Sequence, residues 1–266
     1  MSDLYWLSDA QMAKLSPFFP KSHGKPRVDD RRVLSGIIFI NRNGLRWRDA
    51  PTAYGPPKTL YSRWKRWSEK GIFTRMLLEL ADQGGETETL MIPSRDIGSR
   101  NALPGRGRNP SENAPHCHQP TAEKGGRGRL IGRTKGGMNS KLHAVTDAVG
   151  RPLRMFLTAG QRSDYIGARA LLSDLPTAKH MLADRGYDAD WYREALEEKG
   201  ITPCIPSRKG RKITIPHDVD RYKKRHQIEN SFARLKDWRR VATRYDRCPK
   251  VFLSACALAA VVIFWL

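Results

Sequence analysis

The stretch RYKKRHQIENSFARLKDWRR, residues 221–240, is rich in Lys and Arg but carries a single glutamate near its centre. A helix turns by about 100° per residue, so spacings of three, four and seven residues keep side chains on one face. The residues that share such a face are Tyr222, Arg225, Glu229 and Lys236. The apolar stripe beside them consists of Ile228, Phe232 and Leu235. This pattern predicts a helix with a buried edge that presents one acid, one phenol and two cations together.

Two interpretations of this grouping are open from the local sequence. In the first, the segment is a solvated helix and the glutamate makes an internal salt bridge. In the second, Glu229 holds a divalent cation while Arg225 and Lys236 receive phosphate oxygens, because carboxylates suit hard cations and guanidinium groups suit phosphate. The rest of the chain has to decide between them.

The charge of the whole chain favours a nucleic-acid partner. Its 266 residues carry a formal net charge of +21, and the pI is near 10.2. Residues 208–250 hold fifteen Lys or Arg against five Asp or Glu, and residues 124–154 hold eight against one. Two basic blocks of this kind favour a polyanion and disfavour an ordinary metabolic enzyme. A basic RNA-associated protein is one alternative, disfavoured because the sequence has no stacked-aromatic RNA motif.

A second candidate acid stands in HMLADRGYD, residues 180–188. The apolar residues predict a short strand that gives way to a polar turn at Asp184. Ligands of open α/β sheets gather at the carboxyl ends of strands, so this position is a candidate site. The alternative is that Asp184 is only a turn residue before Arg-Gly.

The order of predicted elements indicates a mixed α/β layer fold. Residues 86–92 are predicted to form a strand, and the chain after residue 126 follows a β-β-α-β-α-β pattern ending in a basic helix and an apolar helix. Between them, residues 93–126 have no periodicity and are rich in Pro, Gly, Asn and Ser. We expect an irregular or disordered insert there.

Residues 1–85 are predicted to be helical. Ser8 suits the N-cap of a first helix, Asp29 or Asp30 that of a second, and Gly44 its end. A later helix, TLYSRWKRWSEKG, has two tryptophans that we expect in the core, while Arg63 and Arg66 face phosphate. These features favour a small DNA-binding region of the helix-turn-helix type.

Beyond these derivations, several motifs carry a family resemblance. The spacing of Tyr222, Arg225, Glu229 and Lys236 matches the Y-x2-R-x3-E-x6-K signature of DDE-type insertion-sequence transposases. LADRGYDAD resembles the segment with that family's second aspartate. GRTKGGMNSKLHAVTD, RLKDWRRVATRYDRCPK and RRVLSGIIFINRNGLRWRDAP are similar to the insertion-sequence-five-like branch. The likeness covers nearly the whole chain except about 93–123.

The resemblance implies a ribonuclease-H-like catalytic core over residues 86–266, preceded by the DNA-binding region over 1–85. Asp184 and Glu229 would be the second and third acids, binding two Mg²⁺ or Mn²⁺ ions for strand cleavage and transfer. The implied partner is double-stranded DNA, both terminal inverted repeats and target, bound in a synaptic complex that is compatible with a homodimer.

One position departs from the family pattern. Pro93 stands where the first aspartate is expected, just after the apolar run Leu90-Met91-Ile92. Either Asp96 substitutes for it, or residues 93–123 are foreign to the fold, as a local change of reading frame would produce. We favour the second interpretation, which predicts impaired activity. The chain would then be a DNA transposase with impaired strand cleavage or, alternatively, a catalytically inactive derivative that acts as a DNA-binding protein or repressor.

The remaining features exclude some other classes. The four cysteines form no CxxC pair, and His116-Cys117-His118 has no second ligand pair, so we expect neither disulfides nor zinc. The apolar run at residues 251–266 is shorter than the roughly 20 residues that span a bilayer. We therefore expect a buried terminal helix, no membrane association and a cytoplasmic location.

Overall fold

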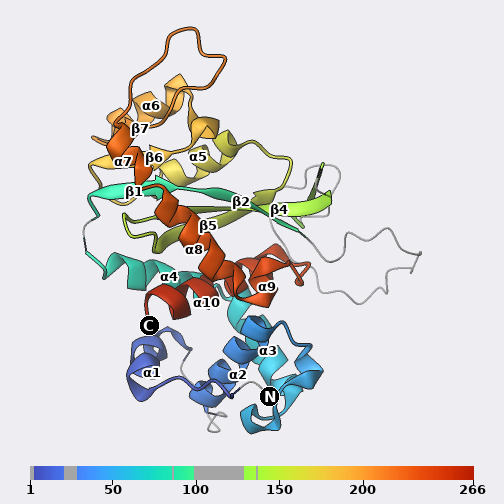
Figure 1. Ribbon diagram of the computed structural model, residues 1–266. Helices are drawn as coiled ribbons and strands as arrows, with labels where there is room; N and C mark the ends of the chain where they lie inside the picture. The colour runs from blue at the N-terminus through green and yellow to red at the C-terminus, as the bar shows by residue number, and fades with distance from the viewer. Residues whose placement is uncertain (1–2, 21–28, 86, 99–128, 136) are drawn as a thin grey trace.

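A seven-stranded mixed sheet forms the centre of the computed structural model, which describes residues 3–20, 29–85, 87–98, 129–135 and 137–266 (Figure 1). The strands are β1 (Thr89–Ile92), β2 (Ser94–Gly98), β3 (Gly132–Thr134), β4 (Gly137–Thr146), β5 (Pro152–Ala159), β6 (His180–Ala183) and β7 (Thr202–Cys204). Strand β4 pairs antiparallel with β1, β2, β3 and β5, whereas β1 pairs parallel with β6, and β6 with β7. The spatial order β5-β4-β1-β6-β7 confirms the predicted ribonuclease-H-like mixed fold.

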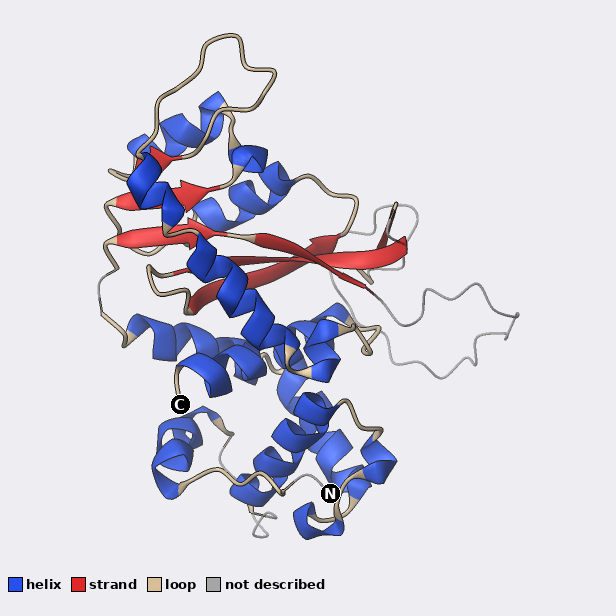
Figure 2. Ribbon diagram, in the orientation of Figure 1, coloured by secondary structure: helices blue, strands red, loops and turns tan. Residues whose placement is uncertain are grey.

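Helices cover both faces of this sheet (Figure 2). One face packs against α5 (Asp164–Leu172) and α6 (Asp190–Glu197), and its core includes Leu90, Ile92 and Ala183. The other packs against α4 (Ile72–Asp82), α8 (His226–Lys236) and α10 (Pro249–Phe264), and its core includes Met91 and Leu182. Alternate residues of each strand thus enter different cores, as the pleat requires.

The N-terminal helices follow the predicted caps closely. Helix α1 (Asp9–Leu15) begins at a capping box formed by Ser8, and α2 (Asp30–Asn43) begins at Asp29. Gly44 ends α2 in the left-handed region, at φ 67°. Helix α3 (Pro57–Glu69) starts two residues before the expected Thr59, because Pro57 fits the first helical turn. Both predicted core tryptophans of α3 are fully buried.

Helix α10 joins the N-terminal helices to the rest of the molecule. It packs against α2, α3 and α4 as well as β5, so these helices share one apolar core with one face of the sheet. The predicted division near residue 85 stays a prediction, and the two regions share this core. Within the described ranges, no helix is long and apolar enough to cross a membrane.

Two predictions about irregular and helical segments need correction. The predicted insert begins at residue 93, but Ser94–Gly98 form strand β2, and 99–126 lie outside the described residues. The single helix predicted over 221–240 is divided into α7 (Val219–Lys223), α8 and α9 (Arg239–Ala242). The amides of Arg225, Gln227 and Ile228 bond to carbonyls three residues back, which tightens the chain between α7 and α8.

Candidate functional site

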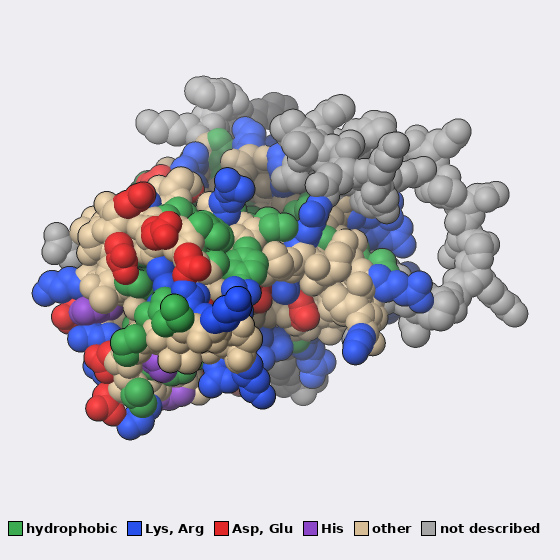
Figure 3. Space-filling view, turned by 90° about the horizontal axis from the view of Figure 1, so that it is seen from above, with side chains coloured by type: hydrophobic (Ala, Val, Ile, Leu, Met, Phe, Trp, Pro, Cys, Tyr) green, Lys and Arg blue, Asp and Glu red, His purple; other side chains and the backbone are tan. Residues whose placement is uncertain are grey.

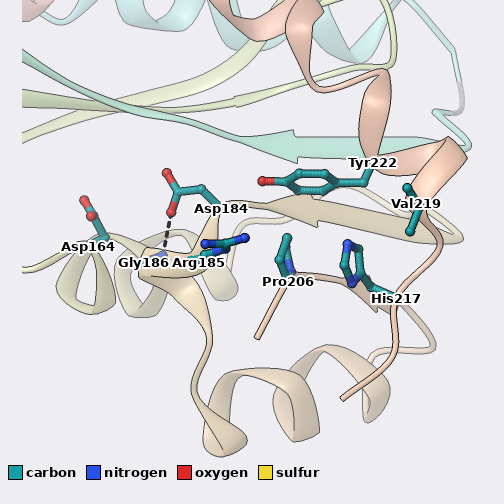
Figure 4. Close-up of a pocket in the computed structure, with 8 residues that line it drawn as sticks. All are labelled: Asp164, Asp184, Arg185, Gly186, Pro206, His217, Val219 and Tyr222. Carbon is teal, nitrogen blue, oxygen red and sulfur yellow. Dashed lines mark hydrogen bonds between the residues drawn. The ribbon is translucent and has the colours of Figure 1, made fainter. Parts of the chain in front are cut away.

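Asp184 follows β6 directly and begins the tight turn Arg185–Tyr187 (Figure 4). Its Oδ1 accepts a hydrogen bond from the Gly186 amide at 2.8 Å. A Cβ on Gly186 would lie 2.8 Å from that oxygen and 3.0 Å from Asp164 Oδ2, so glycine lets the turn approach two carboxylates. Burial raises the pKa of Asp184 above its ordinary value, against the opposite effects of the Gly186 amide and Arg225. The sequence therefore placed this acid correctly, at the carboxyl end of a parallel strand.

The turn after β6 borders an open pocket of about 740 Å³. Asp164, Asp184 and Tyr222 contribute to its wall, and the Tyr222 ring points its hydroxyl toward Asp184 (Figure 4). Burial raises the pKa of this phenol, so it stays protonated and able to donate at neutral pH.

Helix α8 carries Glu229, which Arg225 links to Asp184. The Arg225 Nη2 lies 3.4 Å from Asp184 Oδ2, and its Nη1 lies 3.8 Å from Glu229 Oε1. One guanidinium thus contacts both acids that the sequence singled out. Glu229 remains 44% exposed, and Tyr222 reaches the site from α7, despite the break between the two helices.

The register of β1 identifies the residue beside Asp184. Ile92 pairs with Ala183 in the parallel ladder, so the next position along both strands sets Pro93 beside Asp184. Paired residues of a parallel ladder point to the same face, as Met91 and Leu182 do in their common core. The strand face next to Asp184 therefore presents a proline ring where the family resemblance places a carboxylate.

The strand continues through Pro93 without a shift. Met91 pairs with Thr146 and Ser94 with His143, which is one register, and the Pro93 carbonyl accepts from the Ala144 amide at 3.1 Å. Arg95 consequently lies on the face of Pro93, where its guanidinium forms an ion pair with Glu229. Asp96 lies on the opposite face and is exposed. The substitution of Asp96 for the first acid is therefore incompatible with this strand.

The residues present do not fit a two-metal site. In the described part of the chain, no group of three or more His, Cys, Asp or Glu side chains could hold a metal ion. The oxygens of Asp184 and Glu229 face Arg225 and Arg95 instead, and Pro93 offers no side-chain oxygen. A pair of hard divalent cations needs several carboxylate oxygens with free lone pairs.

Sequence reasoning missed a third acid next to the site. Asp164 begins α5, and its Oδ1 accepts from Ser94 Oγ at 2.6 Å and from Lys141 Nζ at 3.1 Å. Its charge contributes to the raised pKa of Asp184. An aspartate in the first turn of a predicted helix complements the helix dipole, so nothing in its local sequence indicated a further role.

A second arginine–carboxylate cluster is centred on Asp188, four residues after Asp184. Asp188 is fully buried, and its Oδ1 accepts from Arg193 at 2.8 Å and from Arg211 at 3.1 Å, while its Oδ2 accepts from the Arg208 amide at 2.9 Å. Burial alone would raise its pKa, but the Arg208 amide and Arg193 outweigh this effect, and the pKa is lowered. Asp188 thus anchors the basic loop after β7 and does not cap α6, which is preceded by Ala189 without a side-chain cap.

The other predicted DNA-contact residues have different surroundings. Arg66 and Lys236 are exposed. Arg63 is directed at Asp30, 3.2 Å away, and its side chain is only 12% exposed. Arg66 and Lys236 are thus accessible to a ligand, whereas Arg63 joins α3 to α2.

Comparisons with known proteins agree with this architecture. Residues 7–77 match the family model described as "Putative transposase of IS4/5 family", and residues 111–264 match the model "Transposase DDE domain". A protein of Brucella ovis named "Putative transposase for insertion sequence element IS6501" is 40% identical over 130 residues, which are 48% of this chain and 99% of the relative. The corresponding protein for element IS402 of Burkholderia cepacia is 32% identical over 156 residues, covering 52% and 72%.

The fold also resembles a solved structure. The piggyBac transposase synaptic complex with hairpin DNA superposes with a TM-score of 0.52 and 9% identity. The match covers 94% of this chain and 68% of the other. At this level of identity the similarity concerns the arrangement of helices and strands alone.

Proposed function

This chain belongs to the DDE-domain transposases of the IS4/5 type, and we propose that it binds double-stranded DNA at transposon ends but does not cleave it. The observation that carries the proposal is the register of β1, which sets Pro93 beside Asp184 on the face of Glu229. The family resemblance expects the first of three metal-binding acids there. With arginines on the other two acids, the site lacks the oxygens that metal-dependent strand cleavage requires.

The capacity to bind DNA rests on charge that remains intact. Figure 3 shows the face that carries α6, α7 and the loop after β7, on which Lys and Arg side chains lie together with a group of Asp and Glu side chains. The exposed cations here include Arg185 in the pocket wall, Arg208, Lys209 and Lys212 in the loop after β7, and Lys223 and Lys224 at the end of α7. Such a surface favours a polyanion. The buried Asp188 accepts from the Arg208 amide and so holds the loop after β7 in place. We also propose that Arg66 and Lys236 contact DNA phosphates. The assembly we propose is a homodimer that holds two transposon ends together.

One observation favours a second candidate function, namely metal-dependent cleavage with a relocated acid. Asp164 and Asp184 both lie against Gly186, so two carboxylates still share the pocket wall. Against this, Asp164 is engaged by Lys141 and Ser94 and lies on the face of β2 opposite to Arg95. We therefore favour binding without cleavage.

The test is a comparison of binding and nicking on one labelled duplex that carries the terminal repeats flanking the coding sequence. We expect retarded mobility of the duplex but no Mn²⁺-dependent nicking by the natural chain. Nicking that disappears in Asp184→Asn, Glu229→Gln or Asp164→Asn would contradict the proposal and identify the working acids. Arg66→Ala and Lys236→Ala should each lower the slope of log affinity against log salt by about 0.9 for each phosphate contact removed.

A further inference from the structure

We infer that Arg95 occupies the place of a divalent cation at Glu229, so that arginines neutralise the carboxylates of this site and exclude metal. The inference rests on the proposed function, because it explains why binding would persist without cleavage. It assigns a role to a residue in a segment whose sequence predicted no regular structure. Three features of the described residues support it.

The first feature is the fixed direction of the Arg95 side chain. Arg95 pairs with Leu142 of β4, and its neighbour on the same face, Ile97, is buried in the core that also contains Ile228 of α8. Since Ile97 anchors this face, the Arg95 guanidinium projects from the sheet toward α8. Its ion pair with Glu229 follows from strand alternation and does not depend on a flexible loop.

The second feature is the balance of charge. Glu229 contacts Arg95 and Arg225, while Asp184 contacts Arg225 and the Gly186 amide. Two carboxylates thus face two guanidinium groups, and the formal charge of the cluster is zero. A guanidinium donates to the lone pairs that a metal would need, and its positive charge repels a dication. A metal could enter only if an arginine left.

The third feature is the absence of a competing acid on the same face of the strand. Asp96 points to the opposite face of β2, and Asp164 is paired with Lys141 at 3.1 Å. Besides Arg225, which contacts both acids, the local obstacles to a metal site are a proline at 93 and an arginine at 95. Arg95 is open to substitution, since its side chain is 42% exposed and its ion-pair partner in the described part of the chain is Glu229.

The experiment is a Mn²⁺ titration, followed by the magnetic resonance signal of the free ion, of the natural chain, R95A, P93D and P93D/R95A. We expect no saturable binding by the natural chain, and binding by the double variant at least about tenfold tighter than by P93D, a difference of 1.4 kcal/mol. P93D/R95K keeps the positive charge and should bind as weakly as P93D. P93D/R95A/D184N should lose the gain.

Two results would overturn the inference. Asp184-dependent Mn²⁺ binding by the natural chain would show that Arg95 excludes no metal. Equal affinities of P93D and P93D/R95A would show that the proline alone is the obstacle. Circular dichroism checks that each variant folds. If P93D variants unfold, R95A against R95K in the natural background replaces them, with tighter Mn²⁺ binding expected for R95A and equal affinities contradicting the inference. Metal binding is measured without DNA, so this result is separate from the binding and nicking assays.

Discussion

Two arginine–carboxylate clusters stand near the carboxyl end of β6, and they differ chiefly in burial. Asp188 is completely buried, and the Arg193 side chain that pairs with it is 6% exposed. Glu229 and its partner Arg95 are 44% and 42% exposed. A buried charge without its partner has no water to replace it, whereas an exposed one is readily hydrated. We therefore expect the ion pairs of Asp188 to stabilise the fold, and the ion pair of Glu229 to occupy its carboxylate with little effect on stability.

The largest effect that tests this contrast should come from Asp188→Asn. The substitution removes the negative charge that Arg193 and Arg211 share and leaves their guanidinium groups partly buried. Loss of one partner of a buried ion pair costs about 3–5 kcal/mol, so we expect the free energy of unfolding to fall by that amount. Urea denaturation measures it.

Asp190→Asn is the matched control for this prediction. Asp190 also pairs with Arg211, but its side chain is 71% exposed. The expected loss is below about 1 kcal/mol. Similar losses in the two variants would break the distinction between the buried and exposed clusters.

A buried histidine produces a pH dependence of stability of intermediate size. His143 is fully buried against Phe156, with Nε2 2.9 Å from Thr158 Oγ1, and burial lowers its pKa from 6.5 to about 4. Between these values the unfolded chain binds more protons than the folded one. The stabilisation is therefore complete above pH 6.5 and is lost as the pH falls toward 4, by about 3 kcal/mol in total.

The measurement is the free energy of unfolding of the natural chain and of His143→Gln at several pH values from 7 to 4. We expect the variant to lose less stability than the natural chain over this interval, because glutamine does not titrate. Parallel curves would assign the acid sensitivity to other groups. The stabilities of the Asp188 and Arg95 variants should be compared above pH 6.5, where His143 does not make the free energy of unfolding depend on pH.

Much of the fold and two of the site acids, Asp184 and Glu229, could be predicted from the sequence, because they follow from local patterns. Short apolar runs predicted the strand that ends before Asp184, and helical spacing placed Arg225 and Glu229 on one face. Arg95 could not be found, since the composition after Pro93 predicted an irregular insert, whereas pairing with β4 imposes a strand. Tertiary pairing outweighed local preference there.

Other residues escaped prediction because their partners are distant in the chain. The partners of Asp188 include Arg208 and Arg211, which lie beyond β7. Arg63 was predicted to face phosphate, and its ion pair with Asp30 of another helix was not foreseen. Asp164 reaches the pocket only because α5 begins beside the turn at Asp184. Each is a long-range contact that no local pattern encodes.

The smallest effect on stability is expected for Arg95→Ala, which tests the other half of the contrast. The ion pair with Glu229 is nearly half exposed, and such pairs contribute between zero and about 1 kcal/mol. Glu229 keeps Arg225 as a partner at 3.8 Å, so its charge is not left alone. Urea denaturation should therefore give a free energy of unfolding within about 1 kcal/mol of the natural chain. A loss as large as that of Asp188→Asn would mean that Arg95 supports the fold, and the two clusters would then differ in exposure but not in role.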